Sequence, residues 1–193
     1  SIHQTLLPRN VEWLSNLLKL EYLDLGGSNI CESFLWLHTL ATLPSLMHLH
    51  LSGCTLSHHN QPFFLNFSSL LTLDISDISY PFANLFVPKW VFSLKKLVSF
   101  SSRFNQFEGP ISHGFRNLTL VENLDLHGNS FSSSIPHWLF GVLFHLKWLD
   151  LSYNNLQGNI PNALGNVTSL ITLHLSGNQL EGPIPTSLEN LTS

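Results

Sequence analysis

A nine-residue pattern of apolar residues recurs along the chain and constrains its fold more than any other feature. The pattern is L-x-x-L-x-x-L-x-L, and its seven complete copies begin at Leu17, Leu43, Phe67, Leu94, Leu118, Leu143 and Val167. An eighth copy begins at Leu191, and consecutive starts are 24 to 27 residues apart. Periods of this length indicate a solenoid, in which each repeat packs only against its neighbours.

The L-x-L pair at the end of each pattern predicts a short strand. Apolar residues that alternate with polar ones, as in Leu23/Leu25 and Leu173/Leu175, bury one face of a strand and leave the other in water. Such a strand buries its apolar face only when successive coils stack, at about 4.8 Å per strand. We therefore expect residues 1–16 to be the tail of an incomplete preceding repeat, residues 17–190 to be seven repeats, and residues 191–193 to begin a truncated eighth.

The second half of each repeat identifies the family. F-E-G-P-I at 107–111, L-Q-G-N-I-P at 156–161 and L-E-G-P-I-P at 180–185 resemble the plant-specific leucine-rich repeat L-x-x-L-x-x-L-x-L-x-x-N-x-L-x-G-x-I-P. The likeness covers about residues 17–193 and is greatest to the extracellular domains of plant receptor-like proteins of the elicitor and immune receptor kind. It implies the α/β repeat class: a right-handed solenoid with short parallel strands on its concave face and few helices or 3-10 helices on its convex side.

The same resemblance predicts an inward-facing Asn eleven residues after each repeat start. An amide has two donors and an acceptor, so it can satisfy backbone groups that would otherwise be buried unpaired. Four repeats have the Asn, at Asn105, Asn129, Asn154 and Asn178. Ser28 and Cys54 are weaker substitutes at this position, and Ile78 cannot serve.

The N-terminal repeats are less regular than the C-terminal ones. The repeat that starts at Phe67 is 27 residues long and carries an apolar, aromatic insert at residues 80–90, and the next repeat has Ser102 where the second strand Leu belongs. Two interpretations are open for the insert. Its side chains either pack back onto the core, or they form a bulge that contributes to specificity.

The resemblance implies that the solvent face of the strands binds ligands. The polar positions of successive strands should line up in columns on this face, and three aromatic residues, Tyr22, Trp148 and Tyr153, stand among them. The candidate ligand-binding residues are Tyr22, Asp24, His48, His50, Asp74, Arg103, Asp125, His127, Trp148, Asp150, Tyr153 and His174. The alternative for the Asp residues is a general contribution to solubility, whereas a Trp is costly to leave bare on a polar face.

Four N-x-S/T sequons predict N-glycosylation, at Asn66, Asn117, Asn166 and Asn190. All four immediately precede a repeat start, so they should stack along one edge of the solenoid. Glycans at that edge would leave the strand face accessible.

Composition and motifs argue against several other functions. Charged residues make up 10% of the chain and the net charge is −4, which does not fit a nucleic-acid-binding face. The chain has no phosphate loop, nucleophile elbow or paired acids of the kind that catalysis needs, so we expect no enzyme activity and no cofactor. The His48/His50 pair lacks further metal ligands, and no metal site is expected.

The sequence therefore predicts a module that recognises a protein or peptide, as part of a plant cell-surface receptor-like protein in defence or developmental signalling, with co-receptor kinases as further partners. One alternative is a secreted inhibitor of a microbial cell-wall-degrading enzyme, similar to the polygalacturonase-inhibiting proteins. Another is an ectodomain fragment of a receptor kinase. The expected location is the extracellular face of the plasma membrane or the apoplast. Neither a signal peptide nor a membrane span occurs in this piece, so membrane association would require other segments.

Overall fold

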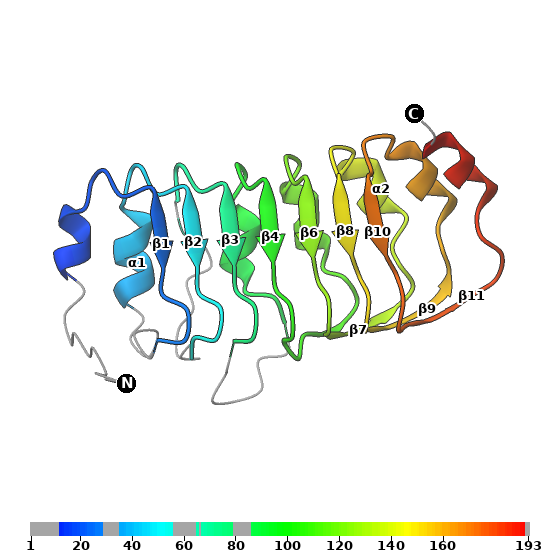
Figure 1. Ribbon diagram of the computed structural model, residues 1–193, viewed down its shortest axis with the longest axis horizontal. Coiled ribbons are helices and arrows are strands. Elements are labelled where there is room, and N and C mark those ends of the chain that lie inside the picture. The colour runs from blue at the N-terminus through cyan, green and yellow to red at the C-terminus, as the bar shows by residue number, and fades with distance from the viewer. Residues whose placement is uncertain (1–11, 29–34, 56–64, 66, 79–85, 192–193) are drawn as a thin grey trace.

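The computed structural model of the chain describes residues 12–28, 35–55, 65, 67–78 and 86–191. Seven three-residue strands form one parallel sheet along the molecule (Figure 1). They are β1 (Tyr22–Asp24), β2 (His48–His50), β3 (Thr72–Asp74), β4 (Ser99–Ser101), β6 (Asn123–Asp125), β8 (Trp148–Asp150) and β10 (Thr172–His174). Each strand pairs with the strand of the next coil, which confirms the predicted solenoid.

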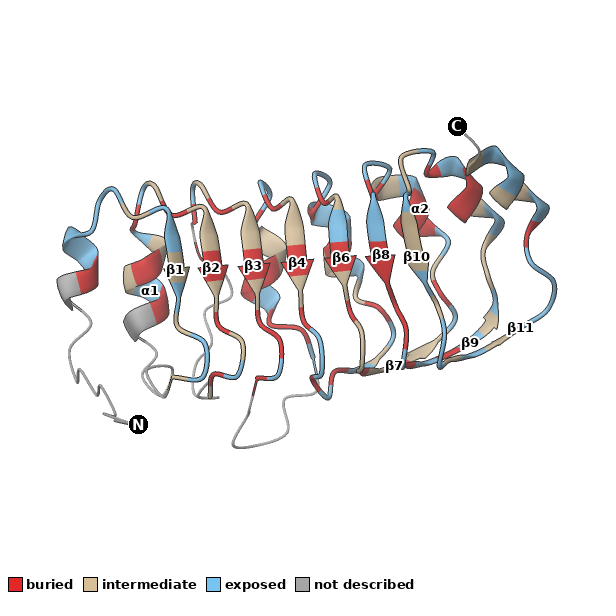
Figure 2. Cartoon of the chain, viewed as in Figure 1, coloured by how far each residue is buried: buried red, intermediate tan, exposed pale blue. Residues whose placement is uncertain are grey.

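The strands form where the apolar pattern predicts them. The middle residue of each strand points into the core, and in β2, β3, β6 and β8 this residue is a fully buried Leu. The middle residues of β1 and β10, Leu23 and Leu173, are only partly buried, since each packs against a neighbouring coil on one side. Burial therefore increases from the end strands towards the middle of the sheet (Figure 2).

Short helices cover the opposite side of the core. The α-helices are α1 (Leu35–Ala41) and α2 (Trp138–Val142). The 3-10 helices are η1 (Glu12–Asn16), η3 (Lys89–Ser93), η4 (His113–Asn117), η5 (Asn162–Asn166) and η6 (Thr186–Leu191). The 3-10 helices bury few of their described residues, as in η4, where only Phe115 is buried, whereas α2 buries Trp138, Leu139 and Phe140. Segments this short depend on packing for their stability.

A second parallel sheet, absent from the sequence prediction, joins the C-terminal coils. It consists of β5 (Glu108–Gly109), β7 (Ser130–Ser133), β9 (Asn155–Asn159) and β11 (Gln179–Glu181), in the order β11-β9-β7-β5. These strands contain or directly precede the second-half motif of each repeat. In the part of the chain that the structure describes, the coils before residue 94 contribute no strand to this sheet.

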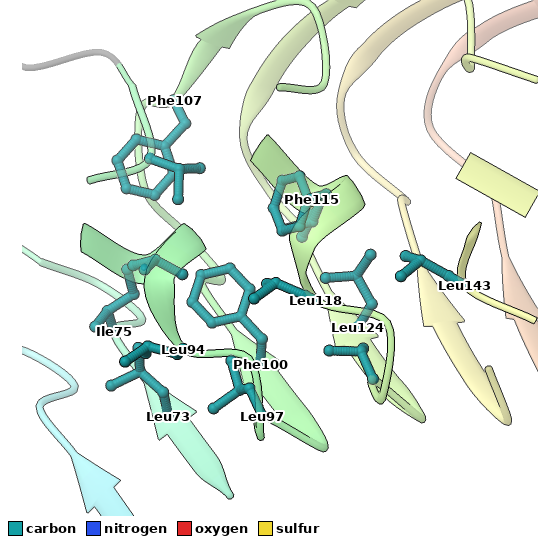
Figure 3. Close-up of a cluster of buried hydrophobic side chains, with 14 of the residues drawn as sticks. Leu73, Ile75, Leu94, Leu97, Phe100, Phe107, Phe115, Leu118, Leu124 and Leu143 are labelled. Carbon is teal, nitrogen blue, oxygen red and sulfur yellow. The ribbon is translucent and has the colours of Figure 1, made fainter. Parts of the chain in front are cut away.

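Between the main sheet and the helices lies a continuous apolar core. In the middle coils three Phe rings replace aliphatic side chains: Phe100 from β4, Phe107 before β5 and Phe115 from η4 (Figure 3). The ring centroids of Phe100 and Phe115 are 5.9 Å apart. Val87 and Trp90 from the insert are also buried, whereas Phe86 is exposed and residues 80–85 lie outside the described residues. The described part of the insert therefore packs largely onto the core.

The inward Asn side chains form a ladder of hydrogen bonds that links one coil to the previous one. Nδ2 of Asn154 donates to the carbonyl oxygens of Leu151 in its own coil and Leu126 in the preceding coil, at 3.1 and 3.0 Å. Its Oδ1 accepts from the backbone N–H of Phe131 at 3.0 Å. Asn129 and Asn178 repeat this arrangement. These amides satisfy buried backbone groups in two coils at once.

Cys54 takes the position of the inward Asn in its own coil. Its thiol donates to the carbonyl oxygen of Leu25 in the preceding coil at 3.1 Å, in the place of the amide donor, and lies 3.8 Å from the Ser28 hydroxyl. At the following position Ile78 has an apolar side chain, and its backbone N–H donates to Oδ1 of Asn105. The Asn amides of the ladder thus begin at Asn105.

Ser102 is a polar residue in the apolar core. Its side chain is fully buried where the other coils have Leu or Ile, and its hydroxyl has no hydrogen-bond partner among the described residues. The carbonyl oxygen of Ser102 accepts from both Asn105 and Asn129. The residue therefore contributes to the ladder through its backbone carbonyl group.

Candidate functional site

The solvent face of the seven-stranded sheet carries three columns of side chains. Because the strands pair in register, the first residues of adjacent strands are direct neighbours, and so are the third residues: Tyr22 is opposite His48, and Asp125 is opposite Asp150. A third column follows two residues after each strand and includes Arg103 and His127. The twelve candidate residues lie in these columns or, for Tyr153, directly beside them.

The four candidate Asp residues all make the same hydrogen bond to the backbone. Oδ1 of Asp24, Asp74, Asp125 and Asp150 accepts from the backbone N–H two residues further on, at 2.8 to 3.1 Å. This bond is of the Asx-turn type, and it stabilises the bend that ends each of these four strands. A purely solubilising role, the alternative from the sequence, therefore does not account for these Asp residues.

At the N-terminal end of the sheet, Tyr22 and two His residues gather. The ring centroid of Tyr22 lies 6.2 Å from that of His48 and 5.2 Å from that of His50. Nδ1 of His48 is 3.0 Å from the Thr72 hydroxyl, and Nδ1 of His50 is 3.8 Å from Oδ2 of Asp74. These contacts fix both imidazoles on the sheet face.

At the C-terminal end, Asp150 connects two His residues from the coils on either side. Nδ1 of His174 is 3.1 Å from Oδ2 of Asp150, and Nδ1 of His127 is 3.9 Å from Oδ1. His127 also bonds the Ser152 hydroxyl at 2.8 Å. The sequence places Asp150 in an exposed column, but the structure corrects this: the residue is only 6% exposed because these neighbours cover it.

The two central carboxyl groups have opposite pKa shifts. Burial would raise the pKa of Asp150, but hydrogen bonds from the Ser152 side chain and backbone and from His174 lower it overall, and His127 assists. For Asp125, burial dominates and raises the pKa. The backbone N–H of His127 and the Arg103 guanidinium, 3.6 Å away, oppose that shift without cancelling it, and the charge of Asp150 adds to it.

Large aromatic side chains stand out from the same end of the sheet. Trp148 is 39% exposed, and its ring meets the His174 ring edge to face at a centroid distance of 5.2 Å. Tyr153 is 63% exposed. Phe104 is 57% exposed and was missed from the sequence, although its position, directly before an inward Asn and occupied by Gly in four other coils, could have identified it.

The site thus divides into two clusters. One contains Tyr22, Asp24, His48, His50 and Asp74 on β1 to β3, and the other contains the candidate residues from Arg103 to His174. Between them lie Ser99 and Ser101 of β4, which have small side chains. The structure brings the candidate residues onto one face but does not bring all twelve into one contact group.

Comparison with known proteins agrees with this geometry. A leucine-rich-repeat family model matches residues 119–180. The receptor-like protein EIX1 of tomato is 36% identical over 128 residues, which are 64% of this chain and 12% of that protein. Receptor-like protein 32 of Arabidopsis thaliana is 33% identical over 175 residues, 87% of this chain and 20% of that protein.

A solved structure shows the same architecture. The Arabidopsis receptor kinase HAESA, in complex with the peptide hormone IDA and the co-receptor SERK1, aligns with a TM-score of 0.75 and 34% identity, over 90% of this chain and 29% of that one. The chain is a plant-type leucine-rich-repeat solenoid. It resembles the repeats of plant receptor-like proteins, and it spans only about an eighth to a fifth of the length of the two relatives above.

The sequons lie at the ends of the helices that precede the leucine-rich strands. Asn117 and Asn166 are the last residues of η4 and η5, Asn190 lies in η6, and all three are exposed. Asn66 lies outside the described residues. The three described sequons therefore share one edge of the repeats, away from the strand columns.

Two further observations concern chemistry and membranes. Among the described residues, no group of three or more His, Cys, Asp or Glu side chains could hold a metal ion. Within the same residues, every helix is too short to cross a bilayer.

Proposed function

We propose that this chain is part of the ligand-recognition region of a plant cell-surface receptor-like protein, and that it binds a protein or peptide through the solvent face of its seven-stranded sheet. The observation that carries the proposal is the aromatic and charged lining of that face. Exposed Trp, Tyr and Arg on a rigid platform are typical anchors of protein interfaces. Relatives named as receptor-like proteins, and a similar ectodomain crystallised with a peptide hormone, support it.

The proposal extends to the setting in which the protein acts. The whole protein would present these repeats at the extracellular face of the plasma membrane or in the apoplast, and would act in defence or developmental signalling together with co-receptor kinases. The HAESA structure, which contains the co-receptor SERK1, supports such a partner. An inhibitor of a cell-wall-degrading enzyme would use the same sheet, but the named relatives favour a receptor.

Glycosylation at the sequon edge belongs to the same proposal. Asn117 and Asn166 are exposed at equivalent positions two coils apart, so we expect both to carry N-glycans when the protein passes through a plant secretory pathway. Glycopeptide mass analysis of the secreted protein tests this. Finding both sites unmodified would contradict the expectation.

Two matched variants test whether the sheet face is the binding surface. Asn123→Arg places a bulky charge on β6 in the middle of the sheet face, whereas Asn162→Arg makes the same exchange on η5 on the helical side; both residues are exposed in the wild type. Immobilised protein is exposed to plant apoplastic fluid, and bound proteins and peptides are identified by mass spectrometry. Partners should be lost with Asn123→Arg and retained with Asn162→Arg. Equal retention by both variants would contradict the proposed function.

A further inference from the structure

Every coil of the main sheet has one residue with a left-handed backbone, three residues after its strand. Four coils have Gly there: Gly27, Gly53, Gly128 and Gly177, with φ from 66° to 72°. The other three have Asp77, Phe104 and Tyr153, with φ from 51° to 54°. Left-handed backbone is unfavourable for any residue with a Cβ, and most unusual for a bulky one. Asp tolerates it, but two exposed aromatic residues need another explanation.

The two aromatic rings lie across the glycines of the coils that follow them. A Cβ on Gly128 would be 2.7 Å from Cδ1 of Phe104, and one on Gly177 would be 3.0 Å from Cδ1 of Tyr153. The ring of His127 stands between them, with its centroid 4.8 Å from that of Phe104 and 5.2 Å from that of Tyr153, edge to face in both cases. Phe104, His127 and Tyr153 thus form a continuous strip along three coils, here called the aromatic ledge.

The polar groups around the aromatic ledge present nitrogen atoms outward and carboxylates inward. The Arg103 side chain is 45% exposed and Asp125, its partner, is 19% exposed. The His174 side chain is 47% exposed and Asp150 is 9% exposed. Both carboxylates already accept backbone N–H bonds, from His127 and Ser152. An approaching molecule therefore meets the guanidinium and the imidazole before it meets either carboxylate.

We propose that the aromatic ledge, with Arg103 and His174 at its margins, binds an extended acidic segment of a protein partner that packs an aromatic or branched apolar side chain on the rings. The proposal rests on the proposed function and assigns the chemistry of the ligand and its place on the sheet. Strained backbone is a feature of functional sites when the surrounding structure holds it in place. Here the neighbouring glycines leave room for the two rings, and the exposed Arg103 guanidinium offers N–H donors to a carboxylate of the ligand.

Glycine substitution removes the rings without disturbing the backbone. Phe104→Gly and Tyr153→Gly give these coils the residue that four other coils already have at this position. Asp77→Gly is the matched control, because it relieves the same left-handed backbone in a coil that does not contribute to the ledge. All three variants should retain the melting temperature of the wild type or exceed it, so that a change in binding cannot be attributed to unfolding.

A library of random short peptides displayed on phage supplies the probe. The wild-type protein should enrich peptides that combine Asp or Glu with an aromatic or branched apolar residue. A synthetic peptide of that sequence should bind the Phe104→Gly/Tyr153→Gly protein at least about tenfold more weakly, as expected for interface anchors, and the Asp77→Gly protein with unchanged affinity. Arg103→Gln with His174→Gln should also weaken binding, and added salt should weaken it further.

Each other result has a defined meaning. Enrichment of basic or uncharged peptides, enrichment of none, or equal affinity for the ledge variants and the wild type would overturn the proposal. Binding of neutral oligosaccharides that disappears in the double glycine variant would assign the ledge to glycans instead. If peptides bind the ledge variants as tightly as the wild type but do not bind the Asn123→Arg protein, the ledge is not the binding site and the proposed function still stands.

Discussion

The coils before and after residue 94 share one repeat but are held together differently. After residue 94, each coil has an inward Asn, and β5, β7, β9 and β11 add a second sheet. Before it, the equivalent positions are Ser28, Cys54 and Ile78, and the described residues contribute only to the first sheet. The apolar pattern alone is thus sufficient for the main sheet. The second sheet occurs, among the described residues, in the same coils as the Asn ladder.

The largest expected effect comes from breaking the ladder in the regular half. Asn154→Ala should lower the free energy of unfolding by about 3 to 4 kcal/mol, because it leaves buried backbone groups of two coils unpaired. Urea unfolding measures the loss, and hydrogen exchange at the Phe131 amide should show where it occurs. Asn155→Ala, at the adjacent exposed position on β9, is the control and should change stability by less than about 0.5 kcal/mol. Equal effects of the two variants would contradict a structural role for the ladder.

The same truncation in the irregular half should cost less. Cys54→Ala removes a weak thiol donor to the Leu25 carbonyl and a small buried volume, so we expect a loss of about 1 to 2 kcal/mol in the same unfolding experiment. A loss as large as that of Asn154→Ala would show that the thiol fully replaces the amide, and the contrast between the halves would then have another cause.

At the boundary between the halves, a substitution should stabilise the protein. Ser102→Ala removes a buried hydroxyl that has no partner among the described residues, and it should raise the free energy of unfolding by about 1 kcal/mol. Ser101→Ala is the control on the solvent face, where the hydroxyl bonds Ser76 at 2.9 Å, and it should not stabilise. Destabilisation by Ser102→Ala would mean that the hydroxyl is satisfied in solution, for example by water.

The smallest expected effect is a pH dependence in the regular half. The lowered pKa of Asp150 stabilises the fold above the unfolded value of about 4, and this is lost as pH falls through the folded value. The raised pKa of Asp125 has the opposite sign, because its protonation relieves the burial of a charge as pH falls towards 4.

Single variants separate these two contributions. Compared with the wild type, Asp150→Asn should lose less stability between pH 6 and pH 3, and Asp125→Asn should lose more, each by less than about 1 kcal/mol. Urea unfolding across this range provides the measurement. The opposite order of the two variants would contradict the assigned directions.

The sequence predicts elements whose cause is local. The strands of the main sheet lie where the nine-residue pattern places them, even in β4, where Phe100 and Ser102 replace the two Leu residues. The inward Asn residues follow from a fixed distance to the repeat start. The second sheet was missed because its strands lack the alternating apolar pattern: β9 reads N-L-Q-G-N, and it pairs only because stacking brings equivalent segments of successive coils together.

The candidate site could be predicted in outline, but the burial of Asp150 and the ring contacts of the aromatic ledge could not. The columns follow from the alternation of side chains along each strand. The burial of Asp150 depends on His127, Ser152 and His174, which come from three different coils, so no single repeat reveals it. The exposure of Phe104 follows from its left-handed backbone, since an aromatic residue in an apolar repeat otherwise suggests a core position.

The direction of the hydrogen bonds in both sheets has a mechanical consequence. These bonds join each coil to the next, so they run along the long axis of the molecule (Figure 1). Tension between the two ends would therefore stretch the bonds lengthwise and open them in sequence, rather than shear many at once. Since each coil contacts only its neighbours, the weakest junction should yield first. The protein would then extend in small steps under a low force. The coils before Asn105, which have no inward Asn, should separate first.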